Sequence, residues 1–273
     1  MAVRVGVIGV AGRMGMALVR AIHASPTLRL AIAIDHAASP ALGQDAGKLA
    51  GLEPVGVLVG SDLRAARGSL ARDSVDVVID FSRADAVGAT AEACAAVGVA
   101  LMIGTTGLDQ ATQARIDQAA GKIPVLVSAN TSVALNVLAE LVRLASRSLP
   151  LEYDIEIFEA HHRHKVDAPS GTALLLGEAA AEGRGQRLER PVSLTGAQPG
   201  ARGAGGIGFS VVRGGDVVGE HDVRFLGTGE QLRLSHVATD RAIFARGALA
   251  AASWLVGRPA GRYTMADFLF PKQ

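Results

Sequence analysis

The stretch that decides the fold is Val3-Arg4-Val5-Gly6-Val7-Ile8, followed at once by Gly9-Val10-Ala11-Gly12-Arg13-Met14-Gly15. The first six residues predict a buried strand, and residues 13–24 predict a helix. Glycines at this strand-to-helix turn let the backbone turn tightly and present free N–H groups to a pyrophosphate. An ordinary turn is the alternative, but the flanking strand and helix favour a dinucleotide site contacted by Gly9, Val10, Ala11, Gly12, Arg13 and Met14.

The rest of the first half repeats this alternation of strand and helix. Strand-length apolar runs lie at residues 28–34, 75–79, 99–103 and 123–127, and helical stretches at residues 84–96 and 109–121. Alternation of this kind predicts parallel strands joined by crossover helices. The expected fold class is therefore α/β, with an N-terminal Rossmann-type doubly wound parallel sheet.

The pattern changes after Asn130. A helix is predicted at 133–146 and strands at 153–158, 208–213, 217–225 and 231–236, with a last helix after Thr239-Asp240. Glycines at 214–216 and 227–229 predict hairpin turns between the later strands. These residues predict a second α+β domain built on an antiparallel or mixed sheet.

Overall charge excludes several kinds of partner. The 273 residues carry 27 basic and 26 acidic side chains, a formal net charge of +1, so nothing global attracts nucleic acid or a membrane surface. The single cysteine, Cys94, cannot form an internal disulfide. With no leader pattern and no long apolar run, we expect a cytoplasmic protein that meets any anionic ligand through local groups.

Three further segments follow predicted parallel strands, where ligands bind in open α/β sheets. Asp35 can accept hydrogen bonds from an adenosine ribose and would repel a 2′-phosphate, although it could also simply cap a turn. The other two segments border the same crevice, but could equally be turns and helix caps. The candidate cofactor contacts here are Asp35 with His36, Gly104 with Thr105 and Thr106, and Ser128 with Ala129, Asn130 and Thr131.

The densest polar cluster is Glu159-Ala160-His161-His162-Arg163-His164-Lys165, after an amphipathic strand. Its cations and protonatable rings suit an anionic substrate that needs proton transfer. A zinc site on the three histidines is the competitor, but Arg163 and Lys165 oppose it, so we expect no metal. A solvated basic loop is the plainer alternative.

Residues 167–172, Asp-Ala-Pro-Ser-Gly-Thr, then lead into a predicted helix at 173–181. The N–H groups of Gly171 and Thr172, with the hydroxyls of Ser170 and Thr172, could seat a carboxylate at the helix start. Ser170 or Thr172 could instead be a simple helix cap, which is compatible with the same geometry.

Taken together, these motifs resemble the dihydrodipicolinate reductase family. The resemblance rests on residues 9–15, on Gly104-Thr105-Thr106-Gly107, on residues 159–165 and on Val166-Asp167-Ala168-Pro169-Ser170-Gly171-Thr172-Ala173. The last two motifs are highly specific, and the four occur in order over most of the chain.

This resemblance implies a dinucleotide-binding domain of residues 1–130 and 240–273, and a substrate-binding and oligomerisation domain of residues 131–239 in a homotetramer. It implies NADH- or NADPH-dependent reduction of 4-hydroxy-tetrahydrodipicolinate to tetrahydrodipicolinate, with loss of water, on the diaminopimelate route to lysine. His161 and Lys165 match the family's acid/base pair, and either could deliver the proton because neighbouring groups titrate together. His162, Ser170, Gly171 and Thr172 match contacts to the dicarboxylate substrate.

Two positions depart from the family pattern. His36 stands where relatives often place an arginine against the 2′-phosphate, and a mostly neutral histidine is a weaker phosphate ligand. We therefore expect NADH preference or dual use. Thr131 replaces an aromatic residue that some relatives carry beside the nicotinamide.

Two other functions are weighed against the reductase. A nucleotide-binding regulator could keep the fold without turnover, but the intact set of His161, Lys165, Ser170, Gly171 and Thr172 argues against it. A dehydrogenase of a small aldehyde or sugar would not need a dicarboxylate seat.

Overall fold

The computed structural model describes residues 2–61, 74–189, 202–203 and 205–271. The chain divides into two compact units, Met1–Val133 with Ala242–Gln273, and Ala134–Arg241. The first unit is discontinuous in sequence, because its last part follows the whole of the second. Each unit has its own sheet and its own apolar core.

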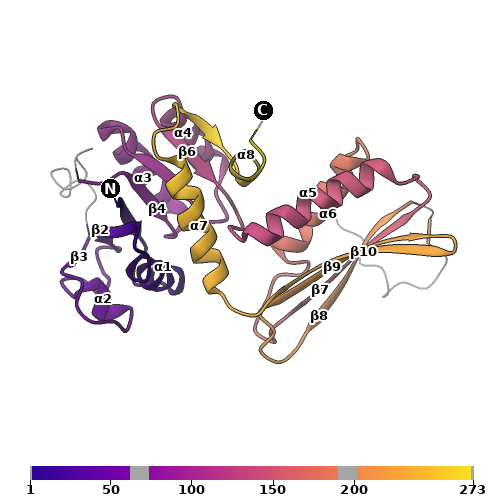
Figure 1. Cartoon of the computed structure of the whole chain (residues 1–273), viewed down its shortest axis with the longest axis horizontal. Helices are drawn as coiled ribbons and strands as arrows, with labels where there is room; N and C mark the ends of the chain where they lie inside the picture. The colour runs from indigo at the N-terminus through magenta and orange to yellow at the C-terminus, as the bar shows by residue number, and fades with distance from the viewer. Residues whose placement is uncertain (1, 62–73, 190–201, 204, 272–273) are drawn as a thin grey trace. The chain divides into compact units, whose positions relative to one another are not determined.

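The first unit is built on seven parallel strands in the order β11-β6-β5-β4-β1-β2-β3. Figure 1 labels β2, β3, β4 and β6 of this sheet. Read from β3 to β6, this is the doubly wound order, with its switch point between β1 and β4. The predicted Rossmann-type sheet is thus confirmed. The strands are β1 (Val3–Ile8), β2 (Leu28–Ile34), β3 (Val59–Gly60), β4 (Val77–Asp80), β5 (Ala100–Ile103), β6 (Pro124–Val127) and β11 (Gly261–Tyr263).

Successive side chains of the central strands enter two different cores, as the period of two in a strand requires. Val77 and Ile79 pack in one core, together with residues of the helices α1 and α7, whereas Val78 packs in the other with residues of α3 and α4. Because both faces are covered, these strands are continuously apolar. The helices of this unit are α1 (Arg13–His23), α2 (Ala46–Leu49), α3 (Ala84–Val97), α4 (Gln110–Ala120), α7 (Ala242–Leu255) and α8 (Met265–Leu269).

The second unit has a four-stranded mixed sheet in the order β10-β9-β7-β8. Its core lies between this sheet and two helices. The elements are α5 (Val133–Ser148), which starts one residue before this unit, β7 (Asp154–His161), α6 (Gly171–Gly183), β8 (Ile207–Arg213), β9 (Gly219–Gly227) and β10 (Glu230–Ala238).

One of the two predicted hairpins is wrong. The turn at 227–229 does join the antiparallel neighbours β9 and β10. The glycines at 214–216 do not join paired strands, because β7 lies between β8 and β9 and pairs with both. Glycine permits the chain to reverse, but which strand lies alongside is decided by the burial of the whole sheet face.

Among the helices that the structure describes, none is long and apolar enough to span a bilayer.

Candidate active site

The glycine loop after β1 is shaped by close approaches that exclude side chains. Gly9 has φ +77°, and a Cβ there would lie 2.6 Å from the carbonyl oxygen of Phe81. A Cβ on Gly15 would lie 2.2 Å from the carbonyl oxygen of Gly9, so only glycine lets α1 start this close to the loop. These approaches fit the packing role of such glycines in dinucleotide loops.

Some N–H groups of the loop donate to carbonyl oxygens within the protein, whereas others belong to the N-terminus of α1, which has no side-chain cap. Those of Gly9 and Val10 donate to the carbonyl oxygen of Ile34, at 2.9 and 3.1 Å. The N–H of Gly12 donates to Gly9 at 3.1 Å, and the Val10 side chain is fully buried. Gly12 begins α1 without any side-chain cap, so the N-terminus of this helix, at Arg13 and beyond, is the part of the loop that can hold a pyrophosphate.

Asp35, at the end of β2, is buried against this loop with 8% of its surface exposed. Its two carboxylate oxygens accept hydrogen bonds from the N–H groups of Ala11 and His36, each at 2.7 Å. Each oxygen keeps a second acceptor direction for a ribose hydroxyl. The His36 side chain is 62% exposed, with its Nε2 3.8 Å from Asp35.

Asp35 and His36 line a cavity of about 300 Å³ in the first unit. Motifs in the sequence indicated Gly9, Asp35 and His36 of its wall, but not the part that comes from the residues after β3, after β4 and along α3. The missed wall residues are Ser61, Ser82, Arg83, Ala86, Ala89, Thr90 and Ala93. Arg83 is the only cation among the described residues that line the cavity, apart from any charge on His36, and it is paired with Asp85 at 2.9 Å.

The two remaining cofactor segments follow β5 and β6, as predicted. Thr105 is buried and donates to the carboxylate of Asp80 at 3.1 Å, whereas Thr106 is exposed. The hydroxyl of Ser128 donates to the carbonyl oxygen of Asn130 at 2.7 Å. Thr131 is buried, and its hydroxyl donates to the carbonyl oxygen of Phe244 at 2.7 Å, so this side chain anchors α7.

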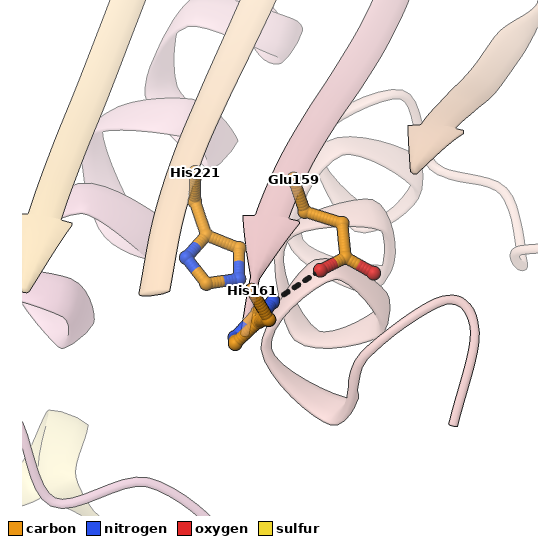
Figure 2. Close-up of side chains that lie close together, drawn as sticks. All are labelled: Glu159, His161 and His221. Carbon is orange, nitrogen blue, oxygen red and sulfur yellow. Dashed lines mark hydrogen bonds and ion pairs between the residues drawn. The ribbon is translucent and has the colours of Figure 1, made fainter. Parts of the chain in front are cut away.

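In the second unit, the chemical cluster is organised by Glu159 and His161 at the end of β7. Alternation along the strand turns both side chains to the same face, and the Nδ1 of His161 is hydrogen-bonded to the Glu159 carboxylate (Figure 2). Because a carboxylate only accepts, Nδ1 donates and Nε2 is the atom left for other partners. A Cβ on Gly219 would lie 3.2 Å from this Nε2, so the glycine leaves room beside it.

Glu159 is a fully buried carboxylate with four donors around it. Besides His161, the N–H of Ser170 donates at 2.9 Å and the guanidinium of Arg213 donates to both oxygens, at 2.8 and 3.0 Å. Burial raises the pKa of Glu159, but the bonds from His161, Arg213 and Ser170 outweigh it and lower the pKa to about 2. Glu159 is therefore ionised, and Arg213 balances its charge.

His221 on β9 is a site residue that the sequence analysis missed. It lies directly opposite Glu159 in the sheet, and its ring centroid is 5.1 Å from that of His161. Its Nε2 is 3.3 Å from the hydroxyl of Ser170. Burial, followed by repulsion from His161, lowers the pKa of His221 to about 3, so this ring is neutral. Only its pairing with β7 reveals it, since the sequence around it carries no motif.

Glu159, His161 and His221 are also a candidate metal site, because their ligand atoms lie within 4.8 Å of one another. The donor set argues otherwise. Arg213 occupies both oxygens of Glu159, and a guanidinium in contact with the carboxylate opposes a second cation there. We assign the cluster to acid–base chemistry.

The loop after β7 carries the remaining predicted residues. Lys165 is partly buried and forms an ion pair with Asp167 at 2.8 Å. His162 is also partly buried; burial and the charge of Arg241 lower its pKa. His164 and Arg163 are exposed.

At the start of α6, Ser170 is the helix cap, with its hydroxyl accepting from the N–H of Ala173 at 3.1 Å. Both its N–H and its hydroxyl are engaged inside the protein, and the residue is 1% exposed. Gly171 is exposed, with open space around the position of a Cβ, and Thr172 is partly exposed. Gly171 and Thr172 therefore form the accessible part of the predicted anion seat.

The dinucleotide-type sheet and the acid–base cluster define the class of this protein, an NAD(P)H-dependent oxidoreductase. Residues 3–131 match the family described as dihydrodipicolinate reductase, N-terminus, and residues 134–269 match dihydrodipicolinate reductase, C-terminus. The chain belongs to the dihydrodipicolinate reductase family, which confirms the resemblance seen in its motifs.

Individual relatives agree over the full length. A 4-hydroxy-tetrahydrodipicolinate reductase of Anaeromyxobacter dehalogenans is 51% identical over 267 residues, covering 97% of each chain. Another, from Alkalilimnicola ehrlichii, is 45% identical over 270 residues, covering 98% of this chain and 99% of the relative. Among solved structures, the dipicolinate-bound dihydrodipicolinate reductase of Paenisporosarcina sp. TG-14 shares the fold, with a TM-score of 0.78 and 24% identity over 99% of this chain and 100% of that one.

Proposed function

We propose that the chain reduces 4-hydroxy-tetrahydrodipicolinate to tetrahydrodipicolinate, with loss of water, on the diaminopimelate route to lysine. The relatives that match it over their full length carry the name of this reductase. The observation that carries the proposal is that one buried carboxylate, Glu159, holds both His161 and the start of α6. A proton donor and an anion seat beside each other suit a dicarboxylate whose ring must be protonated.

The proposed chemistry divides between a reductant and the side chains of the second unit. The reduced nicotinamide, when bound, supplies a hydride. Loss of water from C4 of the substrate gives a conjugated ene-imine. Hydride addition at C4 then builds electron density on the ring nitrogen, which an acid must neutralise. His161 offers Nε2 for this, because Nδ1 is held by Glu159. Lys165 is the second candidate donor, and its ion pair with Asp167 holds its ammonium group at the same loop.

Substrate binding falls to the cations and N–H groups around that acid. The N–H groups of Gly171 and Thr172 begin α6, where the helix dipole favours a carboxylate. His162 lies on the loop between His161 and Lys165 and completes the proposed contacts. In this scheme Ser170 acts indirectly, by capping the helix that presents the seat.

For the cofactor, the proposal is NADH preference or dual use. Asp35 places a negative charge at the cavity wall, which repels a 2′-phosphate. His36 is exposed and offers little compensation, while Arg83 on the same wall supplies a positive charge shared with Asp85. The remaining contacts are proposed at the start of α1 and at the segments after β5 and β6.

The proposed assembly is a homotetramer, acting in the cytoplasm, where the single buried Cys94 would stay reduced. Helices α5 and α6 pack on one face of the four-stranded sheet. By strand alternation, Val212 and Val237 lie on the other face, with 46% and 59% of their surfaces exposed. Exposed apolar side chains on a sheet face suit contact with a second copy. Size-exclusion chromatography with light scattering measures the oligomeric state.

The test of the function is the loss of reduced-nicotinamide absorbance. Purified protein is added to enzymatically generated substrate with NADH or NADPH, and His161→Gln and Lys165→Ala are run beside it. Oxidation that both variants lose supports the proposal. If folded protein binds the nucleotide but oxidises neither cofactor, the reductase function is refuted and a regulatory role takes its place.

A further inference from the structure

In the proposed chemistry Glu159 serves only as a hydrogen-bond partner of its neighbours, although its surroundings indicate a role of its own. Its carboxylate is fully buried, and the three residues that donate to it come from three different segments. His161 belongs to its own strand, Arg213 to the end of β8, and Ser170 to the start of α6. A buried ionised group is costly unless it is fully paired, so this arrangement has to form as a whole.

The first consequence concerns the orientation of His161. A carboxylate accepts only, so it fixes the imidazole with its proton on Nδ1 and turns Nε2 towards Gly219. The geometry at Nε2 thus depends on one oxygen of Glu159.

The second consequence concerns the anion seat. The other oxygen of Glu159 accepts the N–H of Ser170, whose hydroxyl caps α6. Arg213 also binds the loop before α6, because its guanidinium donates to the carbonyl oxygen of Asp167 at 2.6 Å. The helix start and the imidazole are therefore held at a fixed spacing through a single rigid carboxylate.

We propose that Glu159, locked by Arg213, is a positioning residue that sets the proton donor His161 and the carboxylate seat at the start of α6 relative to each other. This inference rests on the proposed reductase function. Neither Glu159 nor Arg213 is expected to contact the substrate. Together they act through His161 and Ser170.

Other charged and titratable groups lie in the same part of the second unit. They are Arg213 from β8, His221 from β9 with His236 beside it on β10, Lys165 with Asp167 and His162 from the loop after β7, and Arg241, which acts on His162. Glu159 is the carboxylate in contact with the imidazole of His161. Removing its charge leaves Arg213 without the carboxylate that it pairs with.

The experiment separates charge from geometry with two substitutions. Glu159→Gln keeps the length and an oxygen for the N–H of Ser170 but loses the charge. Glu159→Asp keeps the charge but withdraws it by one methylene. Glu156→Gln is the matched control, since Glu156 lies on the same strand, faces the opposite side and pairs with Arg202 at 2.6 Å.

For Glu159→Gln we expect kcat to fall roughly 10²-fold, as misplaced catalytic groups do. The KM for substrate should change much less than kcat, because Glu159 does not contact the substrate. Glu159→Asp should also lower kcat, because the shorter side chain no longer reaches His161 and Ser170 together. Glu156→Gln should leave kcat and KM near wild type.

If the wild type is active and Glu159→Gln keeps its kcat, this inference is overturned and the reductase function is left standing. An inactive wild type refutes the proposed function itself. If Glu159→Gln does not fold, judged by circular dichroism and by NADH binding, Arg213→Lys takes its place. That variant keeps the positive charge but loses the paired hydrogen bonds of the guanidinium to both oxygens of Glu159. A lowered kcat therefore supports the inference, and an unchanged kcat overturns it.

Discussion

The buried His221 makes the stability of this protein depend on pH in a way that can be worked out in advance. Burial lowers its pKa to about 3 in the folded chain, from an ordinary value of 6.5. Below pH 6.5 the unfolded chain therefore takes up a proton that the folded chain refuses. Stability is complete above pH 6.5 and is lost as the pH falls towards 3. From pH 7.5 to pH 5.0 the loss is about 1.5 pH units of linkage, or about 2 kcal/mol.

The carboxylate of Glu159 adds nothing to the pH dependence in that window. Its folded pKa of about 2 lies below its ordinary 4.5, so its contribution is present above pH 4.5 and is lost only as the pH falls towards 2. His162 and His236 also have lowered pKa values, because both are partly buried, and they add to the loss in wild type and variant alike.

The assay is urea unfolding followed by circular dichroism at pH 7.5 and 5.0, on wild type and on His221→Asn. Asparagine keeps a polar amide at this position, but it does not titrate. The wild type should lose about 2 kcal/mol more than the variant between the two pH values. His23→Asn, at an exposed position in the last turn of α1, is the control and should behave as wild type. Equal losses in wild type and His221→Asn would refute a buried neutral ring.

Three further perturbations test other parts of the structure. Gly15→Ala forces a Cβ to within 2.2 Å of the Gly9 carbonyl oxygen, so we expect a destabilisation of about 3 kcal/mol and weaker NADH binding, measured by thermal unfolding and fluorescence titration. Unaltered melting would contradict the packing role. Asp35→Ala removes the ribose acceptor, so the Kd for NADH should rise roughly tenfold while NADPH binding changes little; an equal effect on both cofactors would argue against its role in discrimination. Lys165→Met should lower kcat roughly 10²-fold or more in steady-state assays, and near-normal turnover would leave His161 as the sole donor.

Much of the first unit could be predicted from local patterns. Strand β1, strand β2 and the start of α1 fall where apolar runs and glycines place them, because covered parallel strands are continuously apolar. The short elements α2, β3, β11 and α8 were not predicted. They contain too few residues for a period to show, and their positions depend on packing against the finished sheet.

The site could be predicted in part, for a related reason. His161, Lys165 and Gly171 lie within one motif, so their proximity in the sequence indicates them as candidates. His221 and Arg213 reach the same place through strand pairing, which the sequence does not display, and the wrongly predicted hairpin at 214–216 concealed that β9 lies against β7. Val10 and Thr131 illustrate the converse, since their side chains pack inside the first unit and leave at most backbone atoms for a cofactor.

The discontinuity of the first unit has a consequence for the order of folding during synthesis. Helix α7 supplies Ala245, Ala248 and Ala252 to the core that also contains α1, and a Cβ on Gly247 would lie 1.8 Å from the carbonyl oxygen of Thr131. The nucleotide-binding sheet therefore waits, with one face covered only in part by α1, until the last part of the chain has left the ribosome. The middle unit, continuous in sequence, is complete before then. The part of the chain made first is thus the part that finishes last.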